Sequence, residues 1–412
     1  MSSSHYAISV GVPIYSLAFT GKETVVLGGG GGSSKSGIKN KLIYCRLHPE
    51  ARTLDRVHEY ELPKTEDAPM SMAVSPERPV LVAGINESVD KINAGSNNNL
   101  RVFAIKEDSG LEFESARNGI SVLAPEFYQK ATSFAPDGSM LAIGNTNDQF
   151  SIYRYPSLSK VFRCYHFDGQ EVIDADFSED GKLAAGTSDK KVCFFSTETS
   201  KIPAEKPDES GDEDEAPKPH VAQTIERPVL QKDVACSFRS GRFGRKATSG
   251  LFYTIVNSSA PSTGRKRKRG DRKAFVSIWD LKTWQLIKTR TISQTPVTSF
   301  DISPDGSMLA FGTAELAVGV LDAKTLRPRL TILRAHDFAI TALRFNTTSD
   351  IVVSGSVDSS IRVIPIDATA QASRFTTMQT LLLTLLFLLV AILVQYLADG
   401  DLLATARQHL HF

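Results

Sequence analysis

The chain has 412 residues, of which 41% are hydrophobic, so it is long enough to bury one large core or several smaller ones. Its 47 basic and 46 acidic residues leave a net charge of +1, which excludes a general electrostatic attraction to nucleic acid or to an anionic membrane. Four cysteines are spread along the chain without a CxxC pair or a nearby histidine cluster, which indicates no zinc site and predicts reduced thiols in a cytosolic domain.

The amino terminus carries neither the basic region nor the continuous apolar stretch of a signal peptide. From residue 6 to residue 367 a unit recurs, in which a short apolar strand, a polar turn, a second apolar strand ending in small residues and a third strand follow one another. This pattern is typical of the four-stranded blade of a β-propeller. The copies begin near Ile14, Ser71, Thr132, Asp174, Val234, Thr298 and Thr341. We therefore predict an all-β, seven-bladed WD-repeat-like β-propeller over residues 1–370.

A glycine run, Gly28–Gly32, interrupts the first copy between its second and third strands. Consecutive glycines cost too much conformational entropy to be ordinary hairpin residues, so we expect a backbone geometry that points several carbonyls at a cation or several amides at an anion. A phosphate-binding P-loop would need a glycine directly before Lys35 and a helix afterwards. Here Ser34 precedes the lysine and an apolar strand follows, so we do not predict nucleotide binding by this loop.

Two insertions interrupt the later copies. Residues 201–232 are rich in Pro, Glu, Asp and Lys, a composition that predicts a disordered surface loop. The segment 258–272 contains the basic run Arg265–Arg269, which has the composition of a nuclear-import or nucleic-acid patch. Because no aromatic residues interleave with it, we favour a solvated hairpin tip and predict no nucleic-acid partner. Contact with anionic lipid is a further alternative.

The last copies resemble WD repeats most closely, at Val276–Leu281, Ala335–Asp337 and Ser354–Val363, although most copies lack the Trp-Asp pair. We interpret His336 and Asp358 as a structural hydrogen-bonded pair within a blade, because propellers usually bind partners without catalysing covalent reactions.

The carboxy-terminal segment differs from the repeats. Residues 376–397 carry no charge and are apolar around the whole helix circumference, and a helix of about 22 residues covers the hydrocarbon layer of a bilayer. We predict a single transmembrane helix at residues 375–397. Arg374 precedes it, and Asp399 and Asp401 follow it, so the positive-inside rule places the propeller in the cytosol and the tail, 398–412, in the lumen.

The loop residues also carry a family resemblance. Gly29–Gly32, the pair Gly37-Ile38 and the triplet Asn40–Leu42 resemble the potassium-binding loop of the endoplasmic-reticulum guanine nucleotide exchange factors. These proteins act on the small GTPase of the coat protein complex two vesicle coat, and they form the family of the prolactin regulatory element-binding protein. The resemblance includes the opening element Tyr6–Pro13 and the propeller-and-anchor layout of nearly the whole chain.

The resemblance implies a guanine nucleotide exchange factor of the endoplasmic reticulum membrane that promotes GDP release for vesicle export and performs no covalent chemistry. It implies a potassium ion in the loop, with a ligand set drawn from Gly29, Gly30, Gly31, Gly32, Gly37 and Asn40. It also implies that Asn40 contacts the GTPase and that Ile38 acts as an apolar wedge, and we expect Asn40 to lie in an exposed loop. Gly28 adds a fifth glycine to the family pattern, and the chain does not end in a KDEL-type signal.

A non-catalytic propeller scaffold tethered to a membrane is the alternative, and a transcription-related role through the basic run is a third. Only the exchange factor accounts for a glycine run followed by Gly-Ile-x-Asn-Lys-Leu on the first blade.

Overall fold

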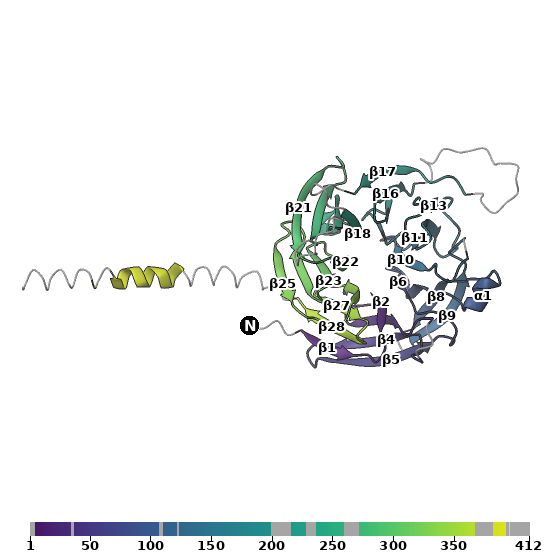
Figure 1. Ribbon diagram of the computed structural model, residues 1–412, viewed down its shortest axis with the longest axis horizontal. Helices are drawn as coiled ribbons and strands as arrows, with labels where there is room; N and C mark the ends of the chain where they lie inside the picture. Colours follow the sequence, from purple (N-terminus) through teal and green to yellow (C-terminus); the bar gives the residue numbers. More distant parts are fainter. Residues whose placement is uncertain are drawn as a thin grey trace, which may run out of the picture. The chain divides into compact units, whose positions relative to one another are not determined.

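The structure is a computed structural model that describes residues 5–33, 37–106, 110–121, 123–198, 216–227, 236–258, 272–366, 382–392 and 395. The chain divides into two compact units, Met1–Pro365 and Ile366–Phe412. The first unit consists of seven four-stranded antiparallel sheets arranged in a ring (Figure 1).

Each sheet is one blade, and the strands follow in sequence from the centre of the ring outward. Blade 1 contains β2 (Ile14–Phe19), β3 (Thr24–Gly29), β4 (Lys41–His48) and β5 (Thr53–Glu61), and blade 2 contains β6 (Ser71–Val74), β7 (Val80–Gly84), β8 (Leu100–Lys106) and β9 (Gly110–Arg117). Blade 3 contains β10 (Gln129–Phe134), β11 (Met140–Asn145), β12 (Gln149–Arg154) and β13 (Tyr165–His166), and blade 4 contains β14 (Asp174–Phe177), β15 (Leu183–Thr187), β16 (Lys191–Ser196) and β17 (Val221–Glu226). Blade 5 contains β18 (Cys236–Phe243), β19 (Leu251–Ser258), β20 (Ala274–Asp280) and β21 (Leu286–Ser293), and blade 6 contains β22 (Val297–Ile302), β23 (Met308–Thr313), β24 (Val318–Asp322) and β25 (Pro328–Ile332).

Blade 7 joins the two ends of the propeller. It contains β26 (Ile340–Phe345), β27 (Ile351–Ser356) and β28 (Ser360–Pro365), and its outer strand is β1 (Tyr6–Ser9) from the amino terminus. Tyr6 pairs with Val363 and Ser9 pairs with Ser360 in antiparallel register. The ring is therefore closed by hydrogen bonds between segments more than 350 residues apart in sequence.

The seven predicted blades are confirmed, but the predicted insertion at 201–232 is too long. Residues 221–226 form β17, the outer strand of blade 4, which pairs with β16 from Lys191↔Glu226 to Phe195↔Val221. Its sequence, VAQTIE, lacks the acidic run of the preceding residues and supplies the backbone groups that β16 needs at its outer edge. Residues 199–215 and 228–235 lie outside the described residues.

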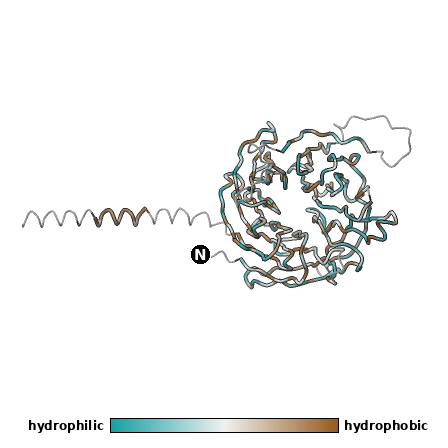
Figure 2. The backbone as a smooth tube through the Cα atoms, in the orientation of Figure 1, coloured by the Kyte–Doolittle hydropathy of each residue, from teal (hydrophilic) through white to brown (hydrophobic). Residues whose placement is uncertain are grey.

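The core lies between neighbouring blades. Between blades 7 and 1, for example, Ile14 and Leu27 pack in one buried cluster with Val353 and Ile361. Hydrophobic and hydrophilic stretches are interspersed around the ring (Figure 2), and strands such as β7 and β23 are buried along their whole length because a neighbouring blade covers each face.

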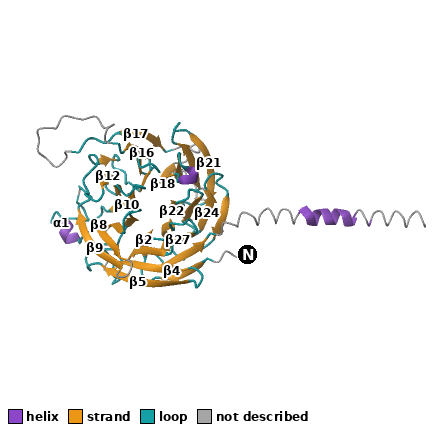
Figure 3. Ribbon diagram, turned by 180° about the vertical axis from the view of Figure 1, so that it is seen from behind, coloured by secondary structure: helices purple, strands orange, loops and turns teal. Residues whose placement is uncertain are grey.

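The connections between antiparallel strands alternate between the two faces of the ring (Figures 1 and 3). The β3–β4 connection lies at one face, together with the second-to-third-strand connection of every other blade and the connections between successive blades. We call this the glycine-loop face. At this face the β7–β8 connection contains the helix α1 (Val89–Asn93), whereas a short 3-10 helix, Lys246–Thr248, lies in the β18–β19 connection on the opposite face.

Eleven helical residues, 382–392, are described within the predicted transmembrane segment, and all of them are exposed. Among the residues that the structure describes, no helix is both long and apolar enough to cross a membrane. The predicted span is therefore not confirmed. Most of the remaining residues of 375–397, and all of the predicted tail at 398–412, lie outside the described residues.

Candidate functional site

The glycine loop, defined as residues 29–40, lies against the connections that precede and follow blade 1. The backbone amide of Gly30 donates to the carbonyl of Pro13 at 3.0 Å, and the amide of Leu62 donates to the carbonyl of Asn40 at 2.9 Å. The described part of the loop is thus hydrogen bonded on two sides by segments that are distant in sequence.

Close approach of neighbouring atoms explains the first glycines of the run. A Cβ atom on Gly28 would lie 2.5 Å from the Cε of Met72, and one on Gly29 would lie 2.1 Å from the carbonyl oxygen of Pro13. At Gly30 a Cβ would lie 2.1 Å from Oδ1 of Asn40, and the backbone φ of +146° is itself one that glycine adopts readily. The expectation of an unusual backbone geometry is therefore confirmed.

Asn40 is a buried clamp inside the loop. Its side-chain oxygen accepts from the amide of Gly32 at 2.9 Å, and its Nδ2 donates to the carbonyls of Gly32 at 2.9 Å and Glu66 at 2.8 Å. The residue is only 5% exposed, so the expectation that it lies in an exposed loop is wrong. Both amide hydrogens are used within the protein, and the side chain therefore fixes Gly32 to the blade 1–blade 2 connection.

Ile38 has the opposite environment. It is 41% exposed and lies between Gly37, whose φ is +79°, and Lys39, whose ammonium group pairs with Glu61 at 2.7 Å. A large apolar side chain is thus held at the surface next to a buried clamp.

Asp67 is a site residue that the sequence did not single out. Its carboxylate accepts from the amide of Ala68 at 2.7 Å, and it lies 3.4 Å from the position that a Cβ on Gly32 would occupy. Burial raises the pKa of Asp67, while hydrogen bonds from the backbone of Ala68 and Ser33 act in the opposite direction. Among the described residues, no cationic side chain contributes to this balance, and the partly buried carboxylate faces the loop.

The blade 1–blade 2 connection is itself held from blade 2. The carboxylate of Glu66, whose carbonyl accepts from Asn40, forms a buried ion pair with Arg101 on β8 at 2.5 Å. The amide of Asp67 donates to the carbonyl of Asn86 at 3.1 Å, and the side chain of Asn86 accepts from Asn97. The β7–β8 connection therefore holds the segment to which Asn40 fixes the glycine loop.

A potassium ion fits the chemistry of this loop. Within the described residues no group of three or more His, Cys, Asp and Glu side chains could hold a metal, so a cation at the loop would take backbone carbonyls, with Asp67 as the adjacent negative charge. Positive φ angles at Gly30, Gly32 and Gly37 allow carbonyl directions that other residues rarely reach. The structure does not test which of the predicted ligands coordinate the ion.

His336 and Asp358 form the predicted structural pair. Nδ1 of His336 lies 3.1 Å from the carboxylate of Asp358, and its Nε2 lies 2.8 Å from the hydroxyl of Ser354. Burial lowers the pKa of His336, so the ring is a neutral hydrogen-bonding group inside blade 7.

The basic run belongs to the β19–β20 connection. The flanking residues Ser258 and Lys273 are joined by a backbone hydrogen bond of 2.8 Å, and this connection begins and ends at the glycine-loop face. Residues 259–271, which include Arg265–Arg269, lie outside the described residues.

Comparison with known proteins agrees with the fold. The family model for the WD domain, G-beta repeat matches residues 327–364, which span β25 to β28. The solved structure of Chaetomium thermophilum Raptor superposes with a TM-score of 0.60 at 13% identity, covering 88% of this chain and 29% of that one. The chain is a WD-repeat propeller.

Similarity to curated proteins is more specific. The chain is 24% identical to the guanine nucleotide-exchange factor SEC12 of Candida glabrata, over 95% of this chain and 80% of that protein. It is 24% identical to the SEC12-like protein 2 of Arabidopsis thaliana, over 81% and 74% of the two chains, and 21% identical to the SEC12 of Rattus norvegicus, over 81% of each. The predicted resemblance to these exchange factors is confirmed, because the chain is similar to SEC12 proteins over most of its length.

Proposed function

We propose that this chain is a guanine nucleotide exchange factor for the small GTPase that initiates coat assembly for vesicle export from the endoplasmic reticulum. The observation that carries the proposal is the glycine loop, in which the buried clamp Asn40 and the close-packed Gly29 and Gly30 hold the exposed Ile38 at the surface. The similarity to SEC12 exchange factors over 95% of the chain supports the same function.

Exchange of this kind needs neither a nucleophile nor a general base. A factor that binds the nucleotide-free GTPase more tightly than the loaded form must, by thermodynamic linkage, weaken GDP binding by the same coupling free energy. A loop that is ordered before the partner arrives loses little conformational entropy on binding, so more of the contact free energy is available for that coupling. In this mechanism Ile38 contacts the partner, and Asn40 positions the backbone that carries Ile38.

We further propose potassium as the ion of the loop and Asp67 as its charge partner. The bound ion supplies a positive charge that holds carbonyl oxygens together. The partly buried carboxylate of Asp67, which no described cation pairs with, and the positive φ angles of the loop glycines support this assignment. Asn40 contributes Oδ1, which accepts one hydrogen bond and keeps a second lone pair.

The function is tested by a fluorescent-nucleotide exchange assay on fragment 1–373, with the coat GTPase as substrate and unrelated small GTPases as controls. The fragment contains every described strand, so the sheets remain intact. Acceleration of GDP release from the coat GTPase alone is expected. If no GTPase is accelerated by a folded fragment, the chain is a membrane-tethered scaffold instead.

Ile38→Ala is expected to lower the exchange rate about fivefold. Truncating an aliphatic side chain that contacts the GTPase removes apolar surface from the interface, which weakens the complex by roughly 1 kcal/mol. The propeller should keep its melting temperature, since the side chain is exposed. Leu286→Ala on β21, where the side chain is 45% exposed, is the matched control and should exchange at the wild-type rate. Equal rates for Ile38→Ala and wild type would place the apolar contact elsewhere.

We also propose that the carboxy-terminal segment anchors the chain in the endoplasmic reticulum membrane with the propeller in the cytosol. The large apolar side chains of residues 382–392 are 49–71% exposed, a surface that suits hydrocarbon better than water. The match to Candida glabrata SEC12 covers 95% of the chain, which is too much to leave out the whole carboxy-terminal unit.

Alkaline extraction and protease digestion of intact microsomes test the anchor. The full chain should stay in the membrane pellet and lose its propeller to external protease, whereas fragment 1–373 should be found in the supernatant. A full chain released by alkali would rule out a spanning anchor, and a propeller protected from protease would reverse the orientation.

A further inference from the structure

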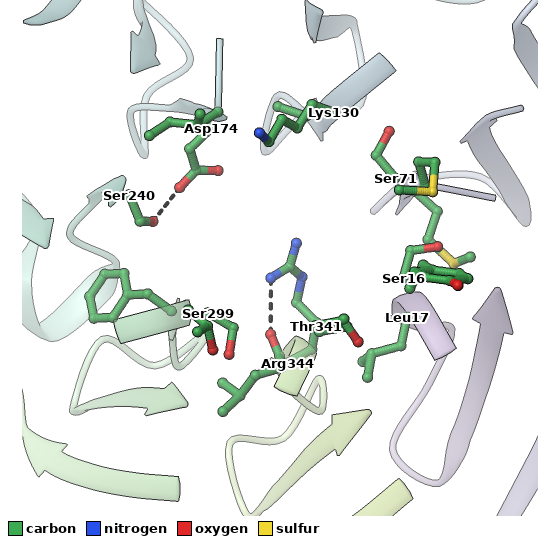
Figure 4. Close-up of a pocket in the computed structure, with 18 of the residues that line it drawn as sticks. Ser16, Leu17, Ser71, Lys130, Asp174, Ser240, Ser299, Thr341 and Arg344 are labelled. Atoms are coloured by element: carbon green, nitrogen blue, oxygen red, sulfur yellow. Dashed lines mark hydrogen bonds between the residues drawn. The ribbon is translucent and has the colours of Figure 1, made fainter. Parts of the chain in front are cut away.

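The inner strands of all seven blades surround a cavity of about 350 Å³ in the central channel (Figure 4). Because each inner strand begins at the glycine-loop face, and the lining residues lie mainly in the first halves of these strands, the cavity occupies that end of the channel. Its volume lies within the range of about 300–1,000 Å³ that is usual for small-molecule sites.

A repeated irregularity of the inner strands directs residues into this cavity. In five of them the pairing with the second strand skips one residue, and the skipped residues are Tyr15, Lys130, Arg239, Thr298 and Thr341. All five line the cavity. Bulges of this kind bend a strand and redirect a side chain, and they are frequent next to binding sites. This ring of bulge residues contains two cations and no carboxylate.

The whole cavity lining is also cationic. It includes Lys130, Arg239, Arg242 and Arg344, against the single carboxylate of Asp174. Asp174 is already engaged, because it pairs with Arg242 at 2.9 Å and accepts a hydrogen bond from Ser240. In Figure 4 the side chain of Arg344 extends into the cavity, and Lys130 lies at its edge.

Arg239 differs from the other cations of the cavity in its contacts. Lys130 pairs with Glu171 at the rim, and Arg344 donates to the carbonyl of Leu343 at 2.9 Å. Arg239, by contrast, makes no hydrogen bond or ion pair with any described residue. Burial lowers the pKa of Arg239, while the nearby charges of Asp174 and Glu171 act in the opposite direction. An anion in the cavity would supply a direct hydrogen-bonding partner for this guanidinium.

The other end of the channel does not share this charge excess. Its cavity is lined by Arg242, Arg245, Lys246 and Arg344, and also by Asp176, Glu179 and Asp301. Arg245 and Asp176 neutralise each other in an ion pair of 2.6 Å. The glycine-loop-face end is therefore the end of the channel that favours an anion.

We propose that the glycine-loop-face end of the central channel binds a small, multiply charged oxyanion, with Arg239 and Lys130 as its cationic contacts. Phosphate and carboxylate groups share the required chemistry, since both accept paired hydrogen bonds from a guanidinium. Tyr15 and Tyr128 also line the cavity, and burial raises the pKa of both phenols, so they remain protonated donors at neutral pH. This site is a neighbour of the glycine loop, because the charge of Asp67 acts on both phenols, and it needs no GTPase.

Calorimetric titration of the full-length chain in detergent with inorganic pyrophosphate tests the proposal, at constant ionic strength set with sodium chloride. One pyrophosphate per chain is expected for the wild type, and Arg239→Gln should raise the dissociation constant at least tenfold. Lys130→Gln is the second variant and should weaken binding in the same direction. Arg290→Gln, which removes a positive charge from the outer strand of the same blade, should bind like the wild type.

A parallel titration with citrate distinguishes the two sources of the anion, because a phosphate site discriminates against citrate and a carboxylate site does not. Unfolding followed through Trp279 and Trp284, both in blade 5 and packed against its core, verifies that each variant is folded. Equal pyrophosphate affinity in the wild type, Arg239→Gln and Lys130→Gln would overturn the proposal. An equal loss in Arg290→Gln, or no binding by the wild type, would also overturn it.

Discussion

Replacing Asn40 with alanine is expected to lower the exchange rate at least tenfold while leaving the propeller folded. The substitution removes three hydrogen bonds that fix Gly32 to the connection at Glu66, so the loop loses the geometry that presents Ile38. Loss of each bond costs about 1 kcal/mol, and each 1.4 kcal/mol of lost coupling is a tenfold change in rate. A stopped-flow exchange assay and a melting curve on the same preparation measure both quantities.

A control must separate loss of the loop from general destabilisation. Asn346 is also a fully buried asparagine, and it clamps the β26–β27 connection on the opposite face through bonds to Lys22 and Ile351. Asn346→Ala should lower the melting temperature at least as much as Asn40→Ala and should keep the wild-type exchange rate. If the two variants lost exchange in parallel with stability, Asn40 would be a structural residue of blade 1 and nothing more.

The architecture was predictable because the blade is a local unit. A strand, a turn and a second strand recur in sequence, and the period identifies seven inner strands within a few residues of where they begin. The outer strands were harder to predict, since they pack only on one side and tolerate irregular sequence. β17 was therefore assigned to an acidic insertion, and the closing role of β1 depends on a pairing between the two ends of the propeller.

The site was predictable only in its local part. The glycine run signals an unusual backbone wherever it lies, and the structure places Gly28, Gly29 and Gly30 against neighbouring atoms that exclude a Cβ. The burial of Asn40 depends on the carbonyl of Glu66, in a connection that follows after two further strands. Asp67 carries no motif, because its role depends on where that connection passes the loop. Bulge residues such as Arg239 give no sequence signal either, since the register shift exists only between paired strands.

Asp67→Asn is expected to abolish the response of the protein to potassium. Burial raises the pKa of Asp67 above its value in the unfolded chain, so without a cation its ionised form disfavours the folded state once the pH rises through that pKa. A bound potassium ion reverses this cost. The wild type should therefore melt at a higher temperature and exchange faster in potassium chloride than in the chloride of N-methyl-D-glucamine, a cation too large for the loop.

The variant should melt at the same temperature in both salts and should exchange slowly in both, because the neutral amide lacks the negative charge that balances the ion. In N-methyl-D-glucamine at neutral pH it should be no less stable than the wild type, since it removes a charge whose burial is unfavourable. Asp55→Asn on β5, where the carboxylate is exposed and pairs with His48, is the control and should keep the full potassium response. If the melting temperature of Asp67→Asn still depended on potassium, the charge partner of the ion would be another group. If the wild type did not respond to potassium, the loop would hold no potassium ion, and the role of Asn40 would be decided by its own test.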